Sequence, residues 1–239
     1  MRLGQLVFCL MLVGALLFAG GCSRGISSKK LKSMPVEIAM MCDSSGYGQA
    51  TLLSSNQALV SAHQLQDETG TVQASGYIMI GEEVRRFELK DCDAKSDLSL
   101  ITLSSSRSAK SEASIPFDNK RPIRNGERAY IVCYRPPDAE LTSYQELYSE
   151  RGALQVVSGT LEELPSLPSD LGSEMTFVPD KGKGYEWVKL APGISGAPVF
   201  IEDPVLGAVI IGVNSSSIPV IERNQNGQRI ESRVKLIAR

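Results

Sequence analysis

Histidine is almost absent from this chain of 239 residues, in which His63 stands alone. The common zinc sites need several histidine or cysteine ligands, and the five cysteines are scattered along the sequence. We therefore expect no metal site and no other cofactor. Any reaction that uses a histidine as its base must use His63.

Long runs of one charge are absent as well. The 25 basic and 27 acidic residues give a formal net charge of -2, and no cluster of Lys and Arg resembles a phosphate-binding face. Nucleic acid is therefore excluded as a partner. Apolar residues make up 42% and charged residues 22% of the chain, which is typical of a globular protein with a core.

No apolar run is long enough to span a membrane as a helix, which takes about 20 residues. The longest covers fourteen residues, from Leu6 to Ala19 behind Arg2, and has the length of a signal-peptide core. It ends on two glycines before Cys22, an arrangement that resembles the lipobox of bacterial lipoproteins, in which the cysteine is acylated. The alternative is a plain secretory signal that is cleaved next to a cysteine.

We therefore predict a lipoprotein signal peptide at 1–21, a lipidated N-terminus and tether at 22–35, and an exported domain at 36–239. Acyl chains on Cys22 would anchor the domain in the bacterial cell envelope. Ser23 follows the cysteine, which by resemblance to Gram-negative sorting favours the outer membrane. The exported domain keeps three cysteines, to which no pairing is assigned: Cys42, Cys92 and Cys133.

Beyond Val36, short runs rich in Val, Ile, Leu and Tyr alternate with clusters of turn residues, without a sustained helical period. This pattern predicts an all-β barrel or sandwich. A polar stretch with two prolines at 104–127 predicts a linker between one half at 36–103 and another at 128–239. Residues 162–184, with three prolines and three glycines, predict a long surface loop.

Three short segments place candidate catalytic side chains at strand ends and turns. His63 follows a predicted strand, behind the small residues Ser61 and Ala62. Asp97 directly precedes an apolar strand, and Ser195 lies in a turn between glycines. Each signal is weak by itself, because aspartates and serines are common in ordinary turns.

Together the segments Leu-Val-Ser-Ala-His63, Ser-Asp97-Leu-Ser-Leu and Pro-Gly-Ile-Ser195-Gly-Ala-Pro-Val resemble trypsin-like serine proteases, and among them the bacterial HtrA-type branch without its PDZ domain. The resemblance implies the chymotrypsin fold, which consists of two six-stranded antiparallel β-barrels. It also implies a serine endopeptidase that acts on protein or peptide substrates through an acyl-enzyme. His63 would be the base, Asp97 its orienting partner and Ser195 the nucleophile.

The same resemblance assigns further residues. The backbone N–H groups of Gly193 and Ser195 would form the oxyanion hole, and Val213, Asn214 and Ser215 would form a wall of the primary substrate pocket. Ile194 departs from the digestive trypsins, which carry an aspartate at this place. An alternative function remains open: a protease-fold lipoprotein with a latent or inactive site that serves as a binding module.

Overall fold

In the part of the chain that it describes, the computed structural model places twelve strands and one short 3-10 helix. At 38–43, 46–47, 216–223, 229–236 and 238 only the backbone path is described. The signal segment, Cys22 and the tether lie outside the described residues, which are 38–43, 46–67, 69–105, 116–134, 153–163, 175–180, 193–223 and 229–238.

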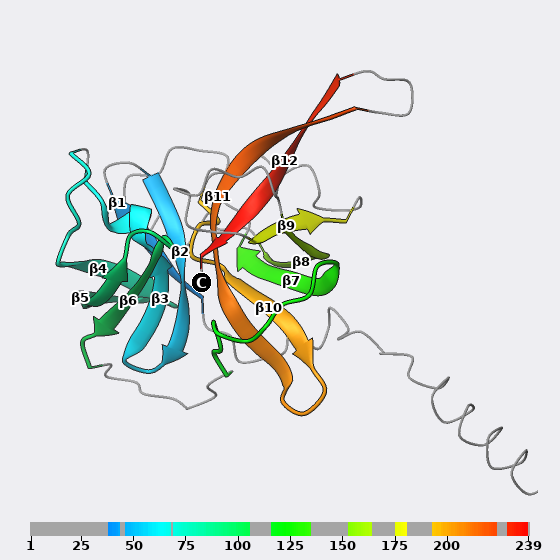
Figure 1. Ribbon diagram of the computed structural model, residues 1–239. Coiled ribbons are helices and arrows are strands. Elements are labelled where there is room, and N and C mark those ends of the chain that lie inside the picture. Colours follow the sequence, from blue (N-terminus) through cyan, green and yellow to red (C-terminus); the bar gives the residue numbers. More distant parts are fainter. Residues whose placement is uncertain are drawn as a thin grey trace, which may run out of the picture.

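The first six strands close a barrel in the order β1-β2-β3-β6-β5-β4. Figure 1 shows this barrel in blue to green, beside the second. Its elements are β1 (Ile38–Asp43), β2 (Gly46–Ser54), β3 (Gln57–Ser61), the 3-10 helix η1 (Ala62–Leu65), β4 (Ser75–Ile80), β5 (Glu83–Asp93) and β6 (Leu98–Leu103).

The last six strands close a second barrel in the order β10-β11-β12-β9-β8-β7. All pairings between named strands in both barrels are antiparallel. The predicted fold, two six-stranded antiparallel β-barrels in an all-β chain, is confirmed. The strands are β7 (Glu127–Tyr134), β8 (Leu154–Glu163), β9 (Met175–Pro179), β10 (Pro198–Asp203), β11 (Gly207–Arg223) and β12 (Arg229–Ala238).

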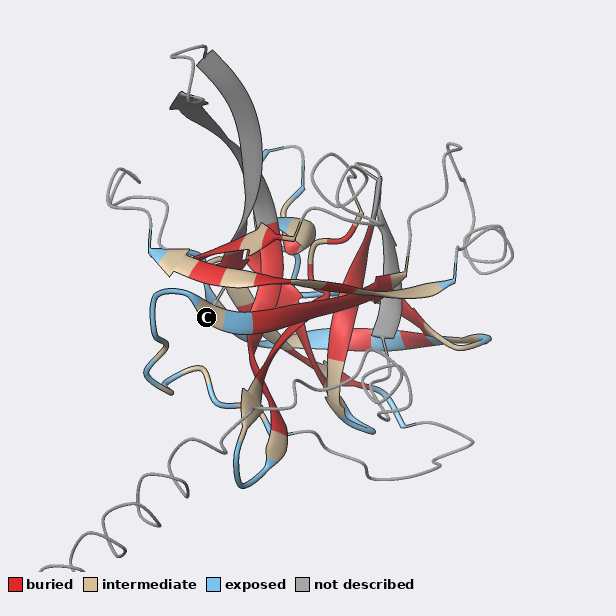
Figure 2. Ribbon diagram, turned by 90° about the vertical axis from the view of Figure 1, so that its right-hand side faces the viewer, coloured by how far each residue is buried: buried red, intermediate tan, exposed pale blue. Residues whose placement is uncertain are grey.

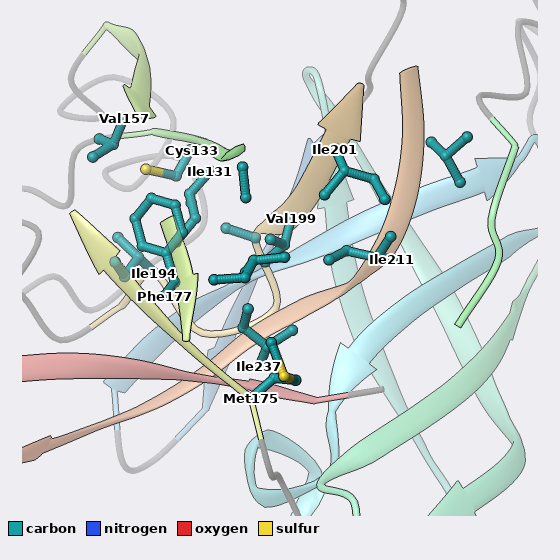
Figure 3. Close-up of a cluster of buried hydrophobic side chains, with 14 residues drawn as sticks. Ile131, Cys133, Val157, Met175, Phe177, Ile194, Val199, Ile201, Ile211 and Ile237 are labelled. Atoms are coloured by element: carbon teal, nitrogen blue, oxygen red, sulfur yellow. The ribbon is translucent and has the colours of Figure 1, made fainter. Parts of the chain in front are cut away.

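Strand β9 corrects the prediction of a long surface loop at 162–184. Met175–Pro179 pairs with both β8 and β12, and without it the second barrel would not close. The side chain of Phe177 is fully buried in the core of this barrel, which Figure 3 shows in close-up. The prolines and glycines around this short strand hid it, because they dominate the composition of the segment.

Each barrel buries the inward side of its strands. Figure 2 shows buried residues along the strands in the interior of the molecule and exposed residues mostly at the turns between strands. The alternating burial along β6 follows the two-residue period of a strand and puts Ile101 into the first core. The second core is the larger of the two, and Leu161 and Phe177 are fully buried in it.

A third apolar cluster joins the barrels. Leu59 on β3 and Val213 on β11 are both buried, and partly buried side chains from β2, β6 and the segment before β7 pack against them. That segment is fixed to the second barrel by a hydrogen bond of 2.8 Å from Ile210 N–H to the carbonyl of Pro116. The cluster brings the end of β3 next to β11. In the described part of the chain, no helix has the length and apolar character to cross a membrane.

Candidate active site

His63 lies on the 3-10 turn η1, immediately after β3. Ala62 and Leu65 anchor this turn in the first barrel, each 1% exposed. The ring of His63 points outward, with 42% of its side chain exposed. The N–H of Ala62 donates to the carbonyl of Asp97 at 3.0 Å, which fixes the turn against the start of β6. The local fold thus presents the imidazole at the surface on a rigid support.

Asp97 binds His63 at two points, the backbone and the ring. Its Oδ1 accepts the backbone N–H of His63 at 2.8 Å, and its Oδ2 lies 2.8 Å from Nδ1 of the ring. Asp97 adopts a positive φ of 54°, a conformation that aspartate and asparagine tolerate better than most residues. Asp97 is the last residue of the turn that leads into β6.

The carboxylate of Asp97 is favoured in its ionised form. Burial raises its pKa and is the largest single influence, but the hydrogen bond and charge of His63 and the hydroxyl of Ser215 outweigh it, so the pKa of Asp97 is lowered. An ionised Asp97 accepts a hydrogen bond from Nδ1–H and thereby selects the tautomer whose Nε2 is free to act as an acceptor. This is the protonation state that a general base requires.

Ser195 lies in a tight turn before β10. Gly193 and Gly196 on either side both have a φ of +82°, which a residue with a side chain rarely adopts. The hydroxyl of Ser195 donates to the carbonyl of Ser215 at 2.7 Å. Among the described residues, no hydrogen bond joins Ser195 directly to His63. Serine side chains occupy three staggered χ1 positions, so a single rotation about χ1 would turn this hydroxyl away from Ser215.

Asn214 fixes the direction of the Ser195 N–H. Its Nδ2 donates to the carbonyl of Ile194 at 3.1 Å, and Ala197 N–H donates to the same oxygen at 3.2 Å. In a planar trans peptide the C=O and the N–H point in opposite directions, so the Ser195 N–H is turned away from these donors. In the described part of the chain, the N–H groups of Gly193 and Ser195 have no acceptor.

Ser215 connects the parts of the site. Its hydroxyl donates to Oδ2 of Asp97, and its carbonyl accepts the hydroxyl of Ser195. The register between β11 and β12 shifts between Asn214 and Ser217, which is a β-bulge, and bulges commonly redirect side chains beside functional sites. The resemblance predicts Ser215 in a pocket wall, and its contact with Asp97 was not predicted. The only signal was a run of three serines that interrupts an apolar strand.

The other two predicted pocket residues lie on opposite faces of β11. The side chain of Val213 is buried in the cluster between the barrels. Asn214 is 1% exposed and turned toward the turn of Ser195, and its Oδ1 is buried without a partner in the described structure. The described residues contain no group of three side chains suited to hold a metal ion.

Solved structures of serine proteases resemble this chain. Kallikrein-related peptidase 10 matches with a TM-score of 0.53 and 13% identity over 86% of this chain and 91% of that chain. A Glu endopeptidase matches at 0.52 and 13%, over 86% of each chain. The serine protease of a human pathogenic astrovirus matches at 0.50 and 11%, over 85% of this chain and 89% of that chain.

At these identities the likeness shows the fold. The chain has the double β-barrel of the trypsin-like serine proteases. No protein-family model matches the chain, and no curated protein matches its sequence.

Proposed function

We propose that this chain is a serine endopeptidase that cleaves protein or peptide substrates with Ser195 as nucleophile, His63 as base and Asp97 as orienting carboxylate. One observation carries the proposal: the carboxylate of Asp97 binds both His63 and Ser215, and Ser215 in turn holds the hydroxyl of Ser195. Ser215 thus links, through its hydroxyl and its backbone carbonyl, three residues that lie far apart in the sequence, in a fold shared with serine proteases.

The chemistry is acyl transfer. The hydroxyl of Ser195 turns from Ser215 toward Nε2 of His63, and its oxygen attacks the carbonyl carbon of the substrate as the proton passes to His63. The C–N bond then breaks, and the amine leaves with that proton. Water hydrolyses the ester of Ser195 by the same route in reverse, which returns the proton to the serine. Asp97 stays ionised and stabilises the imidazolium that forms in both halves.

The developing oxyanion takes the two backbone donors beside the nucleophile. The N–H groups of Gly193 and Ser195 have no acceptor in the described structure, and the first of them belongs to a glycine with a positive φ. Donors that are fixed in place before the reaction stabilise the transition state without reorganisation, and each one contributes about 3–4 kcal/mol. In this proposal, the turn of Ser195 therefore stabilises the negative charge of the oxyanion.

A fluorophosphonate probe on the full chain in detergent tests the proposal. Attack by Ser195 forms a Ser–O–P bond and expels fluoride, so mass spectrometry should locate one adduct on Ser195. The adduct should be lost in His63→Ala and kept in Ser75→Ala, which removes an exposed serine hydroxyl of β4. A folded wild-type chain without an adduct would contradict the proposal and favour the alternative, in which the hydroxyl stays on Ser215 and the domain is a binding module.

We further propose that acyl chains on Cys22 hold this domain at the bacterial cell envelope, as a lipoprotein of the outer membrane where the cell has one, with residues 22–35 as tether. The support is the apolar run of fourteen residues that ends in Gly20 and Gly21 before the cysteine. Lysines at 29, 30 and 32 favour contact with anionic headgroups.

Labelling of cells with a palmitate analogue tests the anchor. Cys22→Ala should lose the label and move to the soluble fraction. Cys92→Ala, a cysteine of the first barrel, should keep both the label and the membrane fraction. A Cys22→Ala chain that stays with the membrane would refute the anchor.

A further inference from the structure

Gln64 follows the proposed base in the sequence, and its side chain reaches the proposed nucleophile. Its Nε2 donates to the carbonyl of Ser195 at 3.1 Å and to the carbonyl of Gln49 at 3.3 Å. Its Oε1 accepts the backbone N–H of Ser61 at 2.9 Å. One amide therefore joins the strand before His63, the neighbouring strand β2 and the turn of Ser195 in the second barrel.

Two glycines make room for this amide. A Cβ at Gly48 would lie 1.7 Å from Nε2 of Gln64. A Cβ at Gly196 would lie 2.8 Å from Oε1 of Gln64 and 1.8 Å from the carbonyl oxygen of Gln49. Side chains at these positions would overlap the amide or the backbone that it binds. The space around Gln64 is therefore shaped for it, on both barrels.

The bonding pattern requires an amide. The N–H of Ser61 needs an acceptor, and the carbonyls of Gln49 and Ser195 take donors. Glutamate has the same shape but no donor when ionised, and methionine has neither a strong donor nor a strong acceptor. Without Gln64, the Ser195 carbonyl would keep the N–H of Gln49 at 2.8 Å, which comes from β2 and not from the turn that carries His63.

We propose that Gln64 is a positioning residue that fixes the turn of Ser195 against the turn of His63, and so sets the approach of the nucleophile to the base. The inference rests on the proposed endopeptidase function. Gln64 touches neither the substrate nor a reacting atom. It acts on the backbone of Ser195, and its loss leaves the His63–Asp97 pair intact, because Gln64 donates to neither residue of that pair and the two bonds between His63 and Asp97 do not involve its amide.

The test compares Gln64→Met and Gln64→Glu with Gln73→Glu, in which the same chemical change is made at an exposed site of the first barrel. We expect both Gln64 variants to react with the fluorophosphonate about 10- to 100-fold more slowly per folded molecule, since a small misplacement of reacting groups costs this much. With a peptide substrate the loss should fall on kcat, with KM changed less than about twofold.

A spectroscopic readout separates positioning from general damage. Because His63 is the sole histidine, the imidazole NMR signals report on it alone. We expect the Nδ1 proton bound to Asp97 to resonate at the same place in wild type, Gln64→Met and Gln73→Glu, although only Gln64→Met reacts slowly. If Gln64 had only a structural role, its loss would lower the melting temperature. It would not slow the reaction of Ser195 while leaving the hydrogen bond between His63 and Asp97 unchanged.

Three results overturn the inference. The first is a labelling rate of the folded Gln64 variants within twofold of wild type. The second is a shifted Nδ1 proton in Gln64→Met, which would place Gln64 in the pair itself. The third is failure of both variants to fold while Gln73→Glu folds, which would make Gln64 a structural residue. If wild type itself is not labelled, the proposed function fails instead, so the two failures are distinguishable.

Discussion

The two barrels contribute different kinds of groups to the site. The first barrel supplies His63 and Asp97, the proposed base and its orienting carboxylate, and joins them by bonds that span 34 positions of the sequence. The second barrel supplies a hydroxyl and backbone N–H groups on a turn with two positive-φ glycines. The contribution of the first barrel depends on ionisable side chains. The contribution of the second barrel depends on the positions of backbone atoms in the turn of Ser195.

The two contributions also differ in what holds them. The two hydrogen bonds between His63 and Asp97 lie within the first barrel, and the second barrel adds one hydroxyl, that of Ser215, to Asp97. The turn of Ser195 is held from the other barrel: Gln49 Nε2 donates to the carbonyl of Gly193 at 3.0 Å, and Thr51 Oγ1 donates to that of Gly196 at 2.8 Å. The turn of Ser195 therefore depends on contacts from the first barrel for its shape.

The largest effect should come from the titratable half. Asp97→Asn keeps a residue that tolerates positive φ but removes the charge, so Nδ1 of His63 loses its fixed tautomer. We expect kcat to fall by about 10⁴-fold. Asp180→Asn, the same change at the end of β9, should leave kcat unchanged. A residual kcat within tenfold of wild type would contradict the role of Asp97.

The joint between the barrels comes next. Leu59→Ala in the joint and Leu161→Ala inside the second barrel truncate equally buried leucines, and each should cost about 2–5 kcal/mol of unfolding free energy. Only Leu59→Ala should also slow fluorophosphonate labelling at temperatures where both variants are folded, because only it loosens one barrel against the other. Equal labelling rates would show that the joint does not shape the site.

A smaller effect should come from the support of the Ser195 turn, where kcat should respond more strongly than the free energy of unfolding. Asn214→Leu removes the donor that directs the Ser195 N–H, and we expect kcat to fall about 10- to 100-fold. The free energy of unfolding should change by less than about 1 kcal/mol, because the substitution also removes a buried oxygen without a partner. Parallel kinetics and denaturant melts measure both. A large loss of stability with full activity would reverse the assignment.

The smallest effect should be the loss, at low pH, of the stability that the ionised Asp97 contributes. Since the pKa of Asp97 is lowered in the folded protein, its ionised form contributes stability that is complete above the unfolded-state pKa of about 4. That contribution is lost as the pH falls through the folded-state value. The difference in melting temperature between wild type and Asp97→Asn should therefore shrink from pH 7 to pH 2. A constant difference over this range would contradict the lowered pKa.

The sequence predicted the fold well because strands are local patterns. A short run rich in apolar and β-branched residues marks β6 without help from the rest of the chain. The strand at Met175–Pro179 escaped because a five-residue strand among prolines and glycines carries too little pattern of its own. Its place in the barrel comes from pairing with β8 and β12, which no single window of sequence contains.

The candidate site divides in the same way. His63, Asp97 and Ser195 stand in recognisable segments, and the structure places the first two in contact and joins the third to them through Ser215. Their catalytic roles stay predictions. The contacts of Gln64 and Ser215 with the other barrel span 131 and 118 positions, so they depend on how the barrels dock. No short motif encodes them.

The hydrogen bonds between the barrels have a consequence for the time at which the proposed active site is assembled. A chain that emerges from synthesis or export presents His63 and Asp97 long before Ser195 exists. Bonds such as Ser61 Oγ to the carbonyl of Asn214 close loops of more than a hundred residues, 153 positions in this case, and such contacts form late in folding. Under the proposed function, an incomplete or half-folded molecule would therefore carry His63 and Asp97 without an aligned Ser195, and hydrolysis would begin only once both barrels have docked.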